Sequence, residues 1–174
     1  MQNETFTIVG IDTGRNLGVT VYTVDLNFNI VDIDVHYIST AIMNVEAVHK
    51  LEFVSDFLAD ILRIYHPVLV AIESAFMGSF AKAFGSLTAI ITILKRTVVL
   101  ESDAKILNVS PHEGKRIVDA KGTNKVDMLN AILKIDEITR HVNPRIMNEH
   151  EVDSLAVGYV GLERIRSDES ILWL

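Results

Sequence analysis

The sequence contains no cysteine. Without thiols it can form neither a disulfide scaffold nor a thiolate zinc site, and a cysteine nucleophile is excluded. Long hydrophobic runs are also missing: the longest uncharged apolar stretch, Ala83–Leu94, is too short to span a bilayer. The first residues, Met1–Thr7, hold no basic segment leading into an apolar one, so we expect no signal peptide. These absences predict a soluble, cytoplasmic protein with no membrane partner.

The composition is that of a folded globular chain. Of the 174 residues, 49% are apolar, and the mean hydropathy of +0.29 is too high for a disordered or low-complexity protein. This length suits one domain with a substantial core, and we find no internal repeat and no linker. We therefore expect a single domain over residues 1–174.

Strong basic character is missing too, since the net charge at pH 7 is −7. An acidic total argues mildly against nucleic acid as a partner, because polyanions prefer basic surfaces. The charge is uneven, however. Residues 82–145 carry 11 Lys and Arg against 7 Asp and Glu, whereas the rest carries 5 against 16. A basic surface is thus available locally, although ordinary solvated helices show a similar excess.

Three β-branched segments open the chain. Thr5–Ile11 stops at a turn, Leu17–Val24 follows at hairpin distance, and Ile30–Ile38 alternates polar and apolar residues. After them, helical spacing over Val45–Tyr65 leads to Val68–Ile72, a short apolar run typical of a strand buried on both faces. The remaining predicted elements are a helix at Ser79–Leu100, a strand at Lys105–Val109, a helix capped by Ser110, a helix at Val126–Leu133 and a helix at Asn148–Arg166.

This order predicts an α/β fold. Three antiparallel strands, with two more added through helical crossovers, make a mixed five-stranded sheet flanked by helices. The order resembles that of the ribonuclease-H-like architecture. Fold class alone does not determine function, which must be argued from a site.

Candidate site residues lie at strand ends and at the start of the last helix. Asp12 follows the first strand and Glu73 follows the buried fourth strand, so both carboxylates emerge near one sheet edge if these strands are neighbours. His150 and Asp153 share one face of the last helix. Simpler interpretations remain: Asp12 as a turn former, Glu73 in a salt bridge, and the helical pair as a solvated face. Their common position favours a joint site.

Converging carboxylates repel one another, and a divalent cation relieves that repulsion. Oxygen ligands with at most one imidazole suit Mg²⁺ or Mn²⁺ rather than zinc. Two such ions can activate a water and stabilise the leaving oxygen in phosphodiester hydrolysis.

Four segments resemble the motifs of RuvC-type Holliday-junction resolvases, and the resemblance covers about residues 7–164. Ile8–Gly14 is similar to the first motif, with Thr where Pro is usual, and Ala71–Met77 to the second, with its aromatic residue. Lys115–Ile132 resembles the lysine-containing segment, and His150–Ala156 resembles the last motif, where Asp is commoner than His150. Gly-Ile-Asp-x-Gly also begins sugar kinases and actin-like ATPases, but these need a second domain. We therefore expect no nucleotide cofactor.

The resemblance implies a catalytic site that binds two divalent ions, Mg²⁺ or Mn²⁺, at the scissile phosphate. Its four metal ligands would be Asp12, Glu73, His150 and Asp153. His150 could instead be a general base, and Glu151 is the alternative if His150 has no role. Lys125 matches a family lysine that supports the transition state.

The resemblance also assigns DNA contacts. Phe76 corresponds to an aromatic residue that stacks on bases near the crossover, while Lys115 and Arg116 lie where family members approach phosphates. Arg15, just past Asp12, is a further candidate. Each has a plainer interpretation, Phe76 as a core residue and the basic residues as solvated charges.

The implied function is that of a structure-selective endodeoxyribonuclease that resolves four-way DNA junctions by paired symmetric nicks. A homodimer would match the two-fold symmetry of the junction, and the apolar helix Ser79–Leu100 is the expected interface. Two alternatives are a nuclease of broader scope, acting on other branched DNA or RNA-containing substrates, and a junction-binding protein that has lost its nuclease activity.

Overall fold

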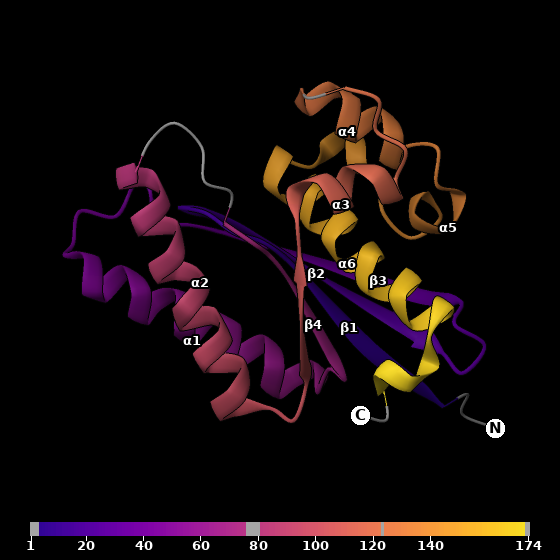
Figure 1. Cartoon of the computed structure of the whole chain (residues 1–174), viewed down its shortest axis with the longest axis horizontal. Coiled ribbons are helices and arrows are strands. Elements are labelled where there is room, and N and C mark those ends of the chain that lie inside the picture. Colours follow the sequence, from indigo (N-terminus) through magenta and orange to yellow (C-terminus); the bar gives the residue numbers. More distant parts are fainter. Residues whose placement is uncertain (1–3, 76–80, 123, 173–174) are drawn as a thin grey trace.

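A five-stranded mixed sheet in the order β3-β2-β1-β4-β5 forms the centre of the fold (Figure 1). The computed structural model describes residues 4–75, 81–122 and 124–172. Strands β1, β2 and β3 are antiparallel, and β4 and β5 run parallel to β1. The predicted mixed sheet is confirmed. The strand bounds are β1 Thr5–Asp12, β2 Asn16–Asp25, β3 Ile30–Ser39, β4 Leu69–Glu73 and β5 Lys105–Val109.

Helices cover both faces of this sheet, with α1 and α2 on one side and α6 with the shorter helices on the other (Figure 1). The sequence indicated the long helices and the Ser110 cap, whose Oγ accepts a hydrogen bond from the Glu113 amide. It did not indicate the short elements α5, η1 and η2. The helix bounds are α1 Ala47–Tyr65, α2 Ala81–Glu101, α3 Pro111–Ile117, α4 Lys125–Ile132, α5 Asp136–Thr139, η1 Pro144–Ile146, α6 Glu149–Ser167 and η2 Glu169–Leu172.

Alternation along β1 divides the core between the two faces. Val9 and Ile11 pack with α1 and α2, whereas Ile8 packs with α6. Because successive side chains of a strand point to opposite faces, Asp12 belongs to the same face as Ile8. The catalytic candidate at the end of β1 therefore lies on the α6 side of the sheet.

Helix α6 is fixed to the sheet by buried polar contacts as well as by apolar packing. Thr20 and Ser154 hydroxyls lie 2.7 Å apart, and the Tyr22 hydroxyl donates to the Leu155 carbonyl at 2.7 Å. The buried hydroxyls of Thr20, Tyr22 and Ser154 thus all have partners, as buried polar groups require. These bonds join β2 to the first half of α6 and set the position of its N-terminal turn.

Within the described ranges, no helix is both long and apolar enough to cross a membrane.

Candidate active site

The ends of β1 and β4 bring Asp12 and Glu73 together. Parallel pairing aligns Ile11 with Ile72, so the residues that follow emerge side by side at one edge of the sheet. Thr13 adds a further link, because its hydroxyl donates to the Glu73 carbonyl at 3.2 Å. Asp12 is only 6% exposed. The condition for a shared edge is met, because β1 and β4 are neighbours in the sheet.

The first turn of α6 is held by a capping box. The Asn148 side chain accepts hydrogen bonds from the amides of His150 (2.9 Å) and Glu151 (3.1 Å). In return, the Glu151 carboxylate accepts from the Asn148 amide at 2.7 Å. Such reciprocal bonds satisfy amides that a helix start leaves without partners. Glu151 thus serves the helix terminus, and His150 is the residue of this pair that faces Asp12.

The imidazole of His150 lies between two carboxylates. Its Nδ1 is 2.7 Å from Oδ2 of Asp12, and its Nε2 is 3.5 Å from Oε1 of Glu149. An ionised carboxylate can only accept a hydrogen bond, so the proton of this contact belongs to Nδ1. In the neutral imidazole Nε2 then carries the lone pair, which is available to a metal ion or a proton.

Glu73 and Asp153 sit in an environment that disfavours their charged forms. Burial, followed by the charge of Asp12 and a side-chain hydrogen bond with it, raises the pKa of Glu73 to about 9. Burial and the charge of Asp12 raise the pKa of Asp153 to about 6, although His150, Lys115 and Lys125 partly oppose this rise. Three carboxyl groups therefore act on one another at the edge of the sheet.

The two candidate lysines, Lys115 and Lys125, interact with this acidic cluster in different ways. Lys115 on α3 is close enough to lower the pKa of both Glu73 and Asp153. Lys125, the first residue of α4, forms an ion pair with Glu149 and also acts on Asp153. Arg116 is exposed on α3. Phe76 lies outside the described residues.

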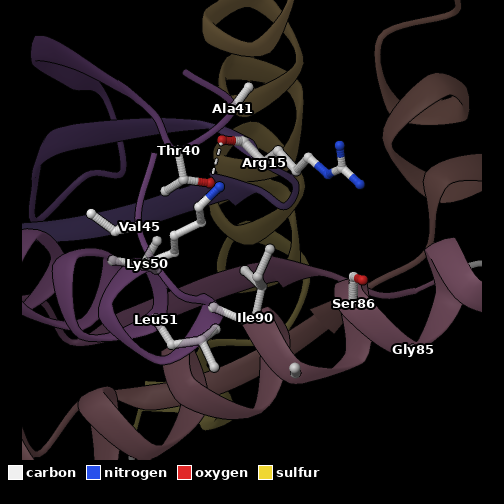
Figure 2. A pocket seen from close by; sticks show the side chains of 12 residues that line it. Arg15, Thr40, Ala41, Val45, Lys50, Leu51, Gly85, Ser86 and Ile90 are labelled. Carbon is white, nitrogen blue, oxygen red and sulfur yellow. Dashed lines mark hydrogen bonds between the residues drawn. The ribbon is translucent and has the colours of Figure 1, made fainter. Parts of the chain in front are cut away.

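Arg15 lies on the turn after β1, at a cavity of about 520 Å³ between the N-terminal parts of α1 and α2. Figure 2 shows the guanidinium of Arg15 directed away from the labelled apolar residues, while Lys50 extends toward Thr40. The Thr40 hydroxyl donates to the Arg15 carbonyl at 3.0 Å, which holds the turn in place (Figure 2). None of the lining side chains is acidic. Arg15 is therefore three residues beyond Asp12 in the chain, but it lines this cavity and not the acidic cluster.

The donor chemistry of the cluster fits a divalent cation. Asp12, Glu73 and Asp153 offer carboxylate oxygens and His150 one imidazole nitrogen, a set suited to Mg²⁺ or Mn²⁺. Burial and the charge of Asp12 raise the pKa of Glu73 and of Asp153, so a bound cation would favour their ionised forms. In the part of the chain that the structure describes, however, no three His, Asp or Glu side chains are arranged to hold an ion. The candidate ligands contact one another in pairs, so side chains must rotate before they can bind one ion together.

Three residues at this site were not indicated by the sequence. Glu149 bridges Lys125 and His150, Tyr37 stacks on the His150 ring, and Gly18 underlies the His150 backbone. The contacts of Tyr37 and Gly18 depend on strand register and on a residue more than a hundred positions away, and that of Glu149 depends on the approach of α4. A capping box was the only local signal near Glu149, and it points to Glu151 instead.

The mixed sheet in this order, with carboxylates at the ends of β1 and β4 and on α6, defines a ribonuclease-H-like nuclease fold. A family model described as crossover junction endodeoxyribonuclease RuvC matches residues 8–160. The chain belongs to the RuvC family, a family of metal-dependent endodeoxyribonucleases.

Solved structures agree with this assignment at the level of the fold. Thermus thermophilus RuvC in complex with Holliday junction substrate is 15% identical, with a TM-score of 0.73 over 94% of this chain and 96% of that one. Another Thermus thermophilus RuvC structure gives 14% identity and a TM-score of 0.74 over 93% and 97% of the two chains. The yeast mitochondrial Holliday junction resolvase Ydc2 is 9% identical, with a TM-score of 0.65 over 98% of this chain and 85% of that one. A comparison with curated protein sequences finds no significant match.

Proposed function

We propose that this protein is a structure-selective endodeoxyribonuclease that resolves four-way DNA junctions by paired symmetric nicks. The observation that carries the proposal is the convergence of Asp12, Glu73, His150 and Asp153 at one sheet edge in a RuvC-family chain. The Thermus protein with the same fold is in complex with a Holliday junction. Because junction DNA would be its substrate, we expect the protein to act in the cytoplasm, without a membrane partner.

Asp12, Glu73, His150 and Asp153 would hold Mg²⁺ or Mn²⁺, two ions at each site. Bound ions of this kind neutralise charge on the scissile phosphate and lower the pKa of the attacking water. The protein supplies a buried edge at which the ligands meet in pairs, and Asp12 is the shared partner, in contact with both His150 and Glu73.

Protein side chains supply the remaining chemistry. Lys125 is anchored by Glu149 beside Asp153, where its ammonium group can stabilise negative charge that develops on the phosphate. With Nδ1 protonated against Asp12, His150 presents Nε2 either as a ligand or as a base that accepts a proton from water. Both roles require the His150 ring to keep a fixed orientation.

DNA binding is assigned to a basic surface around the acidic edge. Lys115 and Arg116 on α3 would contact phosphates on one side, and Arg15 on the turn after β1 would do so on the other. Phe76 would stack against bases near the crossover. A restricted basic surface on an acidic protein makes binding strongly dependent on salt, because each phosphate contact releases counterions.

A homodimer would provide two sites for the paired nicks, because two-fold symmetry of the protein matches that of the junction. Helix α2 is the proposed interface. Its exposed residues include Gly85, Thr88, Ala89 and Thr92, of which Gly85 and Ala89 also line the cavity beside α1, and nothing lies within 4 Å of a Cβ built on Gly85. Small side chains allow close approach of a second helix. Analytical ultracentrifugation at micromolar concentration tests this, and a monomer would contradict it.

The decisive experiment compares cleavage of a synthetic four-way junction with that of a linear duplex of the same arms, in Mg²⁺, in Mn²⁺ and in chelator. Wild type should nick only the junction, symmetrically and only with metal. Asp12→Asn should bind the junction without cutting it, and Asp56→Asn, an exposed carboxylate on α1, should behave as wild type. Cleavage of forks or RNA-containing substrates at equal rates would favour the broader nuclease. Binding without cleavage by wild type would favour the inactive binding protein.

A further inference from the structure

A row of three residues crosses the sheet beside the acidic edge. Asp12 of β1 pairs with Gly18 of β2, and Gly18 pairs in turn with Tyr37 of β3. The first turn of α6 lies over this row, with His150 directly above Gly18. The register of three strands therefore decides what surrounds the imidazole.

Gly18 permits backbone contact between β2 and α6. A Cβ built on Gly18 would lie 2.0 Å from the carbonyl oxygen of His150, which is too close for any side chain at this position. The main chain of His150 is thus seated on the strand rather than held above it by a side chain. The position of its Cα is fixed, while the orientation of its ring is left to the groups around it.

The ring of Tyr37 supplies one of these groups. The Tyr37 and His150 ring centroids are 6.3 Å apart and the ring planes differ by 19°, an offset stacked arrangement. The hydrogen bond to Asp12 directs one ring nitrogen but allows the plane to rotate about that bond. A second ring lying along the first removes this freedom. Tyr37 itself has only two side-chain torsions and lies on a strand paired along its length.

We propose that Tyr37 is a positioning residue that fixes the plane of the His150 imidazole and so directs Nε2 toward the reacting phosphate. This inference rests on the proposed nuclease function and extends it to β3, which contributes no other residue to the site. Tyr37 acts through His150 and has no direct part in the chemistry. Because the ring face makes the contact, phenylalanine should replace tyrosine and an aliphatic residue should not.

The test compares Tyr37→Leu and Tyr37→Phe with wild type. Val31→Ala is the matched control, because Val31 is an exposed residue at the far end of the same strand. Single-turnover cleavage of the junction at saturating enzyme should fall by about 10–100-fold in Tyr37→Leu, as is typical when a partner that orients a metal-ligating side chain is removed. Tyr37→Phe and Val31→Ala should stay close to wild type. Junction affinity in chelator should be unchanged in all three.

A second measurement examines the stacking without relying on cleavage. The imidazole proton resonances of His150, assigned with His150→Gln, should carry a ring-current shift in wild type and in Tyr37→Phe that is absent in Tyr37→Leu. If wild type cuts the junction and Tyr37→Leu cuts equally fast, the positioning role is wrong while the nuclease function stands. Loss of junction affinity in Tyr37→Leu at an unchanged cleavage rate would make Tyr37 a DNA contact instead. If wild type does not cut, the proposed function fails, and an unshifted His150 spectrum would separately overturn the stacking.

Discussion

Gly10 of β1 and Gly158 of α6 meet backbone to backbone. A Cβ built on Gly10 would lie 2.2 Å from the amide nitrogen and 2.4 Å from the Cα of Gly158. The helix therefore crosses the sheet with no side chain between the two main chains. Asp12 is two residues beyond Gly10, and Asp153 is on the same helix as Gly158. The contact therefore fixes the distance between β1 and α6, and with it the separation of the two acidic residues.

Gly10→Ala should strongly destabilise the fold, because the atoms it meets belong to a backbone that cannot move aside. We expect a loss of about 3 kcal/mol, the upper range for overpacking a core. For a chain of this size that is a fall in Tm of roughly 6–12 °C. Gly114→Ala is the control: nothing lies within 4 Å of a Cβ at that helical position, so it should stabilise the protein by up to about 1 kcal/mol. Equal Tm values for Gly10→Ala and wild type in thermal unfolding would contradict the backbone contact.

Glu73→Gln should separate stability from function. In chelator the variant should be more stable than wild type, because it removes a carboxyl group that burial and Asp12 both disfavour in its charged form. Addition of Mn²⁺ should reverse the order. Wild type should gain about 2.7 kcal/mol when the ion is present at a hundred times its Kd, and the variant should gain far less and cut no junction. Thermal unfolding with and without Mn²⁺ measures both effects, with Asp56→Asn as the control. An equal Mn²⁺ response in Glu73→Gln and wild type would remove Glu73 from the ligand set.

The sequence was informative wherever local pattern and site coincide. Asp12 and Glu73 end apolar strands, so their convergence followed once β1 and β4 were taken as neighbours. Gly18 and Tyr37 gave no such signal, because their importance depends on cross-strand register and on a helix that begins 131 residues after Gly18. Glu149 was passed over for a similar reason. A glutamate at the start of a helix is ordinary, and only the approach of α4 makes it a partner of Lys125.

An ion-pair network at the other end of α6 predicts how stability depends on pH. Arg166 donates to both carboxylate oxygens of Glu137, at 2.7 and 3.0 Å, and to the Phe28 carbonyl at 2.7 Å. Hydrogen bonds from Arg166, and then from Tyr159, hold the pKa of Glu137 below its ordinary value despite partial burial. A carboxylate whose pKa is lower in the folded state stabilises the protein above its unfolded pKa. That contribution is lost as the pH falls through the folded value.

Glu137→Gln should therefore lower the free energy of unfolding by about 1–2 kcal/mol at pH 7, the lower range for a hydrogen-bonded charge that is partly exposed. The difference in free energy of unfolding between Glu137→Gln and wild type should become smaller as the pH falls from about 5 to about 3. Urea denaturation across this range measures it. Asp56→Asn should match wild type throughout, and a constant difference for Glu137→Gln at every pH would show that packing rather than charge is responsible.

Lys115 offers a test of where the DNA lies. It sits on α3 beside the acidic edge, and its charge acts on both Glu73 and Asp153. If it contacts a phosphate, Lys115→Ala should weaken junction binding and reduce the slope of log K against log salt by about 0.9, the contribution of one phosphate contact. Lys134→Ala is the control, because this exposed lysine follows α4 and belongs to no candidate contact. Binding should be measured in chelator so that no strand is cut. A loss of affinity with an unchanged salt slope would mean that Lys115 stabilises the acidic cluster instead of binding DNA, and a reduced slope in Lys134→Ala as well would mean that binding is diffuse.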